Sequence, residues 1–131
     1  MSAFMVELEN QPGQLARLCE AMADSRVNLL LCATTHAGGS GVVAFIADDE
    51  ASAQAVLDEA GTKYLMRPAL TIRMENLPGS GAAAFRKLAN AGVNVDLLLP
   101  VRISEEQFFA VICVDKMEAA SAALGDLVVT S

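Results

Sequence analysis

The sequence predicts an α+β fold built from two copies of a β-α-β-β-α-β unit, and three observations support this prediction. The first is an internal repeat, because Glu9-Asn10-Gln11-Pro12-Gly13 recurs as Glu75-Asn76-Leu77-Pro78-Gly79. The second is an alternation of apolar and polar residues before each Pro-Gly pair, and the third is a helical spacing of apolar residues after it. Together they indicate a duplicated strand, turn and helix.

The repeat has an offset of 66 positions. Applied without gaps, this offset also pairs Val27-Asn28 with Val93-Asn94. It aligns four further identities, Ala44, Ile46, Asp49 and Ala53 with Ala110, Ile112, Asp115 and Ala119. Turn residues, apolar positions and spacing match together, so the high alanine content does not explain the repeat. We therefore expect two domains, residues 1–67 and 68–131, joined without a linker.

Each copy opens with a half-buried strand, residues 5–9 and 70–75, in which apolar and polar residues alternate. The Pro-Gly pair ends the strand, and a helix is expected over about residues 14–25 and in the matching segment. Apolar residues follow the i, i+3, i+4, i+7 spacing of one helical face. In the first copy these are Leu15, Leu18, Cys19 and Met22, and in the second Gly81, Ala84, Phe85 and Leu88.

The rest of each copy predicts two strands, a helix and a last short strand. The strands are expected over residues 27–32 and 42–47, and over 93–101 and 108–114. Asp49 and Asp115 are expected to cap helices over residues 51–60 and 116–124, and short strands over 64–66 and 127–129 end the units. This order predicts two ferredoxin-like βαββαβ units, each an antiparallel sheet with its two helices on one face.

Composition excludes several classes of function. The net charge is −7, which argues against a nucleic-acid or anionic-membrane partner, since both need a basic face. The mean hydropathy is +0.40, but no stretch approaches the ~18–20 apolar residues of a membrane span. Residues 1–4 lack the layout of a signal peptide. We therefore predict a cytoplasmic protein with no membrane partner.

Catalytic and metal-binding patterns are not found. The three cysteines are far apart in sequence, without a C-x-x-C pair, and His36 is the single histidine, so no zinc-type spacing exists. The sequence has no Ser-His-Asp order, no P-loop and no H-E-x-x-H segment. We expect no metal site, no cofactor and no catalytic residue, and hence a protein that is not an enzyme.

The residues that repeat most faithfully can be interpreted in two ways. They are Asn10, Pro12, Gly13 and Asn28, repeated as Asn76, Pro78, Gly79 and Asn94. Pro and Gly shape a strand-to-helix turn, and Asn bonds its own backbone in such turns, which needs no ligand. The same geometry also suits an amino acid, because free N–H groups at a helix start attract a carboxylate and an amide can bind both charged groups. The second reading expects strand ends and helix starts to converge at one edge. From the residue types alone, both readings stay open.

At these residues the sequence resembles the ACT domain, the amino-acid-sensing module of biosynthetic enzymes. Strand, Glu-Asn-x-Pro-Gly, helix, then Val-Asn and an apolar strand is similar to that family in both copies, across essentially the whole chain. The resemblance implies a homodimer that binds a free amino acid at the interface between ACT units, near the turns between the first strand and first helix. The implied ligand-binding residues are Asn10, Gln11, Pro12, Gly13, Gln14, Leu15, Asn28, Asn76, Leu77, Pro78, Gly79, Ser80, Gly81 and Asn94.

The chain departs from the family pattern at two places. The serine-sensing ACT domain of phosphoglycerate dehydrogenase has a histidine two residues before the first Asn, where this chain has Leu8 and Met74. The usual Pro-Gly-x-Leu holds at Leu15, but the second copy has Gly81. The alternative implied by resemblance is a non-catalytic regulatory subunit of an amino-acid biosynthetic enzyme, similar to the small subunit of acetolactate synthase.

Overall fold

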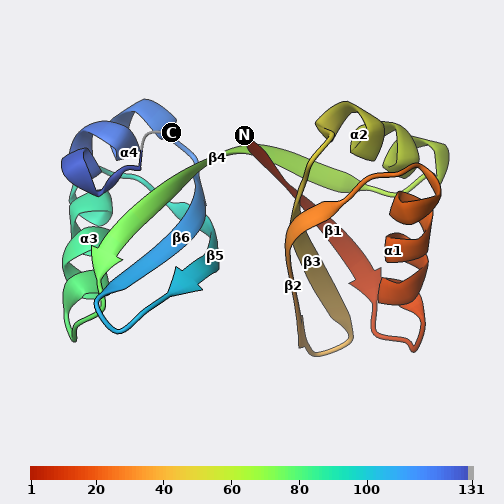
Figure 1. Ribbon diagram of the computed structural model, residues 1–131, viewed down its shortest axis with the longest axis horizontal. Helices are drawn as coiled ribbons and strands as arrows, with labels where there is room; N and C mark the ends of the chain where they lie inside the picture. Colours follow the sequence, from red (N-terminus) through yellow and green to blue (C-terminus); the bar gives the residue numbers. More distant parts are fainter. Residues whose placement is uncertain (130–131) are drawn as a thin grey trace. The chain divides into compact units, whose positions relative to one another are not determined.

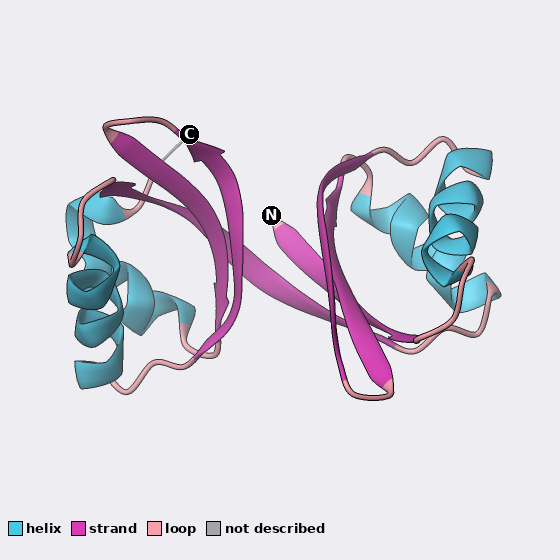
Figure 2. Ribbon diagram, turned by 90° about the horizontal axis from the view of Figure 1, so that it is seen from below, coloured by secondary structure: helices cyan, strands magenta, loops and turns pink. Residues whose placement is uncertain are grey.

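A computed structural model describes residues 1–129, which divide into two compact units. The N-terminal unit is Ser2–Arg67, and the C-terminal unit begins at Pro68 and includes Met1. The elements of both units are labelled in Figure 1. Each unit is an antiparallel sheet whose two helices lie on one face, as Figure 2 shows, so the predicted α+β, ferredoxin-like fold is confirmed.

The N-terminal unit contains β1 (Ser2–Glu9), α1 (Gln14–Asp24), β2 (Leu29–Ala37), β3 (Ser40–Ala47), α2 (Glu50–Glu59) and the start of β4 (Tyr64–Glu75). Its strand order is β2-β3-β1-β4. β1 and β2 both pair antiparallel with β3. The β2–β3 hairpin turns at Gly38 and Gly39, so both strands run closer to the turn than the predicted ranges 27–32 and 42–47.

The C-terminal unit continues with α3 (Ser80–Asn90), β5 (Val95–Ile103), β6 (Gln107–Val114), α4 (Met117–Leu124) and the 3-10 turn η1 (Gly125–Leu127). Its strand order is β4-β6-β5, and all of these pairs are antiparallel. The repeated topology places the end of one strand and the start of one helix beside each Pro-Gly turn.

The short strands that were expected to end the units are both different. Residues 64–66 and 70–75 form one continuous strand, β4, with Pro68 inside it. Residues 127–129 are not a strand, because α4 runs into η1 and only Val128 then reaches a bridge to Ile72. The Val129 N–H also donates to the Thr71 carbonyl, at 2.9 Å.

A β-bulge changes the offset between the two units. β5 and β6 pair with a shift between Pro100 and Arg102, so Val101 is an extra residue without a counterpart in β2. Phe4 corresponds to Leu70 at the offset of 66, and their partners in β3 and β6 are Phe45 and Ile112. Phe45 therefore corresponds to Ile112, which makes the offset 67 beyond the bulge. The ungapped alignment of 44–53 with 110–119 was therefore wrong by one residue.

The two aspartates that were expected as helix caps show the same shift. Asp49 caps α2, since its side chain accepts from the Ser52 N–H at 3.0 Å, as predicted. Asp115 is not the cap of α4, because its Oδ1 accepts from the Asn94 N–H at 2.8 Å. That bond matches Asp48, which accepts from the Asn28 N–H at 2.9 Å. Lys116 occupies the cap position of α4 without a side-chain cap bond.

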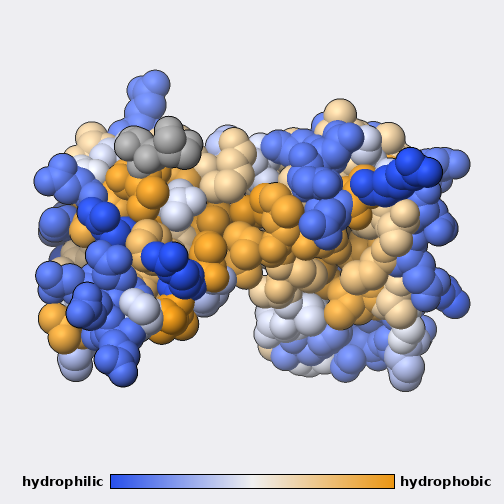
Figure 3. Space-filling view, viewed as in Figure 1, coloured by the Kyte–Doolittle hydropathy of each residue, from blue (hydrophilic) through white to orange (hydrophobic). Residues whose placement is uncertain are grey.

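Each unit has its own core between helices and sheet. In the N-terminal unit Phe4 and Phe45 stack with ring centroids 5.0 Å apart under Leu57. In the C-terminal unit Ile72 and Leu124 are buried in the corresponding cluster. Hydrophilic side chains predominate over the exposed sides of α1 and α3 (Figure 3). Across residues 1–129 no helix is long and apolar enough to cross a membrane.

Leu124→Ala should lower the free energy of unfolding by about 2–5 kcal/mol, because it empties a buried leucine site. Ser121→Ala, an exposed position on the same helix, should change it by no more than about 0.5 kcal/mol. Urea unfolding of both variants measures the difference. Equal stability of the two variants would contradict the placement of Leu124 in the core.

The stability given by the α2 cap should depend on pH. Hydrogen bonds from the Ser52 hydroxyl and N–H hold the pKa of Asp49 below its usual value. A depressed folded-state pKa contributes stability that is present above the unfolded-state pKa and lost as the pH falls through the folded-state pKa. The stability difference between wild type and Asp49→Ala should therefore be constant at neutral pH and shrink below about pH 4. Urea unfolding over a pH series measures it, and a difference that grows in acid would contradict this account.

Candidate functional site

The two Pro-Gly turns have the same backbone geometry. Gly13 and Gly79 occupy the positions before α1 and α3 with φ of 91° and 92°, a left-handed conformation that favours glycine. Neither turn has a side-chain cap. The N–H groups of Gly81 and Ala82 have no acceptor among residues 1–129, so the start of α3 presents free donors.

The first asparagine of each repeat behaves differently in the two units. In the C-terminal unit the Asn76 Nδ2 donates to the Ser104 carbonyl at 2.7 Å, and its N–H donates to the Glu106 carbonyl at 2.9 Å. These bonds tie the turn to the β5–β6 hairpin and leave Oδ1 as an acceptor. The exposed Asn10 side chain has no hydrogen-bond partner among the described residues.

The second asparagine of each repeat lies at the opposite end of its sheet. Glu9 is paired with Ser40, whereas Leu29 is paired with Ala47, at the other end of β3. Seven residues of strand separate these ends by ~23 Å. The same registers separate the two asparagines of the C-terminal unit, as Glu75 pairs with Gln107 and Val95 with Val114. The expectation that these asparagines converge at one edge was wrong, since β1 and β2 run parallel on either side of β3.

The start of α3 opens onto a cavity of about 250 Å³. Four of the predicted residues line it: Asn76, Leu77, Ser80 and Gly81. The other lining residues are Met74, Glu75, Phe85, Leu98 and Phe108. Pro78 and Gly79 shape the turn without lining the cavity, and Asn94 is at the far end of the sheet, where its Nδ2 donates to Asp96 at 2.8 Å.

The aromatic and aliphatic walls of this cavity were not among the predicted residues. Phe85 follows Gly81 by one helical turn, so the spacing that assigned both to one face was a signal for it. Leu98 and Phe108 come from β5 and β6, and no local pattern relates them to the turn. Gly81 leaves room beside Phe85, since a Cβ there would meet that ring at 3.7 Å, an ordinary contact.

The corresponding region of the N-terminal unit has other side chains. Leu15 stands in place of Gly81 and is 39% exposed. Cys19 and Cys32 stand in place of Phe85 and Leu98, and burial together with the neighbouring Cys19 raises the pKa of the Cys32 thiol. Gln14 lines a separate cavity of about 320 Å³ between α1 and α2. Gln11, Pro12 and Gly13 are exposed.

Residues 1–129 contain no group of three side chains able to hold a metal ion. Cys19 and Cys32 are free cysteines, and Cys113 is buried. The described lining of the α3 cavity provides free N–H groups, an amide oxygen and an apolar wall, all of which can bind a ligand.

Comparisons with known proteins agree with this architecture. A family model described as an ACT domain pair matches residues 1–124. A crystal structure from Bacteroides thetaiotaomicron is similar with a TM-score of 0.76 and 21% identity, covering 94% of this chain and 85% of that one. The ligand-free regulatory subunit of aspartate kinase from Thermus thermophilus is similar with a TM-score of 0.67 and 20% identity, covering 96% and 90%. The corresponding subunit from Thermus flavus has a TM-score of 0.65 and 21% identity, with coverage of 94% and 88%. No curated protein matches this chain.

Two glycines two residues apart in the α3 turn should respond oppositely to alanine. Gly79→Ala should destabilise the protein by about 1–2 kcal/mol, because the residue must keep a positive φ. Gly81→Ala should be neutral or stabilising by up to about 1 kcal/mol, because the position is helical and the added Cβ has space. Thermal melts of the two variants compare them, and a stabilising Gly79→Ala would contradict the turn geometry.

Proposed function

Because this chain belongs to the ACT domain pair family, we propose that it is an amino-acid-binding regulatory protein whose ligand binds at the start of α3. The family and the fold shared with regulatory subunits of aspartate kinase support an amino-acid-sensing regulatory role. Catalysis is not part of the proposal, which rests on groups of the cavity that can bind a ligand.

The observation that carries the proposal is the α3 cavity itself. A ligand carboxylate would accept from the free N–H groups of Gly81 and Ala82, where the helix dipole favours negative charge. Its ammonium would donate to the Asn76 Oδ1, whose orientation follows from the bond of Nδ2 to Ser104. The ligand side chain would then lie against Phe85, Leu98 and Phe108.

One unit supplies only one kind of asparagine to such a ligand. Asn76 lines the cavity and Asn94 is ~23 Å away along the strands. A site that uses both kinds, as the family resemblance implies, would need a second ACT unit. The location of the ligand between units, homodimer formation and a ligand role for Asn10, Asn28 and Asn94 therefore stay predictions.

The regulatory output would be a bias in the association of the protein with an amino-acid biosynthetic enzyme. A bound ligand shifts such an equilibrium only if its affinity differs between the two states. The alternative is an interaction subunit that resembles the small subunit of acetolactate synthase and acts on its enzyme without a ligand. The cavity favours the sensing function, because it combines hydrogen-bonding groups with an apolar wall that a small ligand could cover.

Gly81→Leu should abolish the response to the amino acid. Leucine fits the helix start, since Leu15 stands at that position in α1, but its side chain would enter the cavity. A thermal-shift screen of the common amino acids measures the response, because a ligand at about 100 times its Kd adds about 2.7 kcal/mol of stability. Gly81→Ala is the matched control and should keep most of the shift.

Two outcomes of the screen would contradict the proposal. If no amino acid at millimolar concentration shifts the melting temperature of the wild type, the protein is not an amino-acid sensor. Equal capture of a partner enzyme by wild type and Gly81→Leu would then favour the interaction subunit. If Gly81→Leu retains the full ligand-induced shift in melting temperature, the ligand does not bind at the start of α3.

A further inference from the structure

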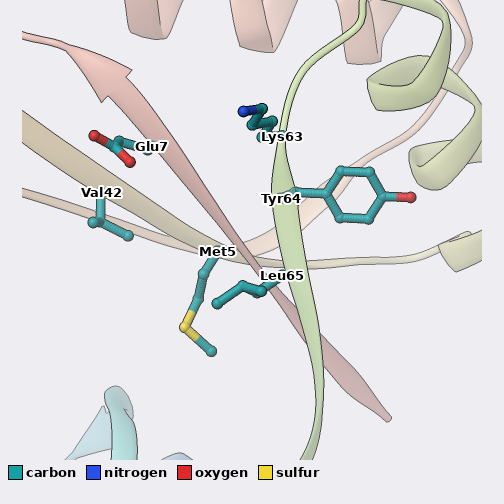
Figure 4. Close-up of a pocket in the computed structure, with 6 residues that line it drawn as sticks. All are labelled: Met5, Glu7, Val42, Lys63, Tyr64 and Leu65. Atoms are coloured by element: carbon teal, nitrogen blue, oxygen red, sulfur yellow. The ribbon is translucent and has the colours of Figure 1, made fainter.

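Another cavity lies on the face of the N-terminal sheet that is opposite its helices. Its volume is about 290 Å³, and it is lined by Met5, Glu7, Val42, Lys63, Tyr64 and Leu65 (Figure 4). All six residues belong to one unit, and none of them was predicted as a site residue.

Strand alternation explains why these side chains meet. Phe4 and Val6 are buried under the helices, so Met5 and Glu7 emerge on the other face of β1. Val42 is directly opposite Glu7 in β3. Figure 4 shows the Tyr64 ring directed away from the other five side chains.

The Tyr64 side chain lies on the helix side of the sheet. Its ring packs 5.9 Å from that of Phe4, and its hydroxyl donates to Asp58 at 3.0 Å. Since neighbours in a strand alternate, Leu65 shares the face that carries Glu7. Lys63 lies just before β4 begins and lines the same cavity.

The cavity joins two opposite charges to an apolar floor. Neither Glu7 nor Lys63 has an ion-pair partner among residues 1–129, although both line the same cavity. Val42 is 42% exposed and Leu65 is 53% exposed, so apolar surface stands open between them. A carboxylate, an ammonium group and an uncovered apolar surface are the three complements of an amino acid with an apolar side chain.

The C-terminal unit lacks this arrangement, so the fold alone does not produce it. The register places Arg73 and Phe109 where the N-terminal unit has Glu7 and Val42. The Arg102 guanidinium stacks 4.7 Å from the centroid of the Phe109 ring, which covers that aromatic surface with a cation.

We propose that this cavity is a second amino-acid site, distinct from the α3 cavity, which binds a zwitterion with an apolar side chain. Lys63 Nζ donates to the ligand carboxylate, and the carboxylate of Glu7 accepts from the ligand ammonium. The ligand side chain covers Met5, Val42 and Leu65. The two protein charges are bridged by the ligand, whose own charges are one carbon atom apart.

The test uses L-leucine and the full chain in the Gly81→Leu background, in which the α3 cavity is filled. Isothermal titration should find one leucine per chain. Lys63→Gln and Glu7→Gln should each weaken binding about tenfold or more, since each removes a charged hydrogen-bonding partner. Lys63→Arg should retain most of the affinity, and Arg86→Gln and Glu59→Gln, exposed charges on helices, should leave it unchanged.

Ligand analogues distinguish specific recognition of the amino acid from nonspecific apolar binding. The keto acid of leucine lacks the ammonium, and 3-methylbutylamine lacks the carboxylate, so each should bind about tenfold more weakly or worse. Equal binding of leucine and the amine would overturn the proposal, as would binding that Lys63→Gln leaves intact.

The two proposals can fail separately. Leucine binding by wild type that disappears in Gly81→Leu would overturn the second site and leave the α3 site standing. Binding that survives Gly81→Leu but not Lys63→Gln would support the second site, whatever the α3 cavity does. Sedimentation tests whether this sheet face instead binds a second copy of the chain. The second site would be overturned if the Gly81→Leu variant binds no leucine and self-associates, and if adding Leu65→Asp makes it monomeric.

Discussion

Both units depend on one packing arrangement, in which two helices cover one face of an antiparallel sheet. A half of this chain has about 66 residues, a size at which a single core is marginal. The helix side of the N-terminal sheet supplies its core, which buries Phe4, Phe45 and Leu57. The strand period of two then forces every second residue onto the opposite face, where Met5 and Glu7 are available for binding.

The same arrangement explains why both turns have kept their backbone while their surroundings diverged. Pro-Gly must end the strand and start a helix at an angle that returns it to the sheet, and the left-handed conformation of Gly13 and Gly79 achieves this. The side chains above the turn carry no such constraint. In one unit they are Gly81 and Phe85 around a cavity, and in the other Leu15 and Cys19. The two copies therefore share the backbone of the turn and differ in the side chains above it.

The two units differ in the side chains that line their cavities. The C-terminal unit offers free N–H groups and an amide beside an apolar wall, whereas the N-terminal unit offers a separated Glu7 and Lys63 over aliphatic side chains. Two different solutions to the recognition of a zwitterion would allow two amino acids, or two concentrations of one, to act on the same chain. The two sites would act independently unless they are coupled through β4, the one strand that contributes to both.

The sequence by itself determined the repeat, the element order, the Pro-Gly turns and the helix face that contains Gly81 and Phe85, because these depend on local periodicity and backbone preference. It did not reveal the bulge at Val101, since one extra residue in a strand leaves the apolar pattern of 93–101 intact and shows only in the pairing with β6. The tertiary structure alone separated Asn76 from Asn94, because strand direction and register decide which ends meet. It also brought Leu98 and Phe108 to Gly81, and Lys63 to Glu7, through contacts between residues far apart in the chain that no local pattern encodes.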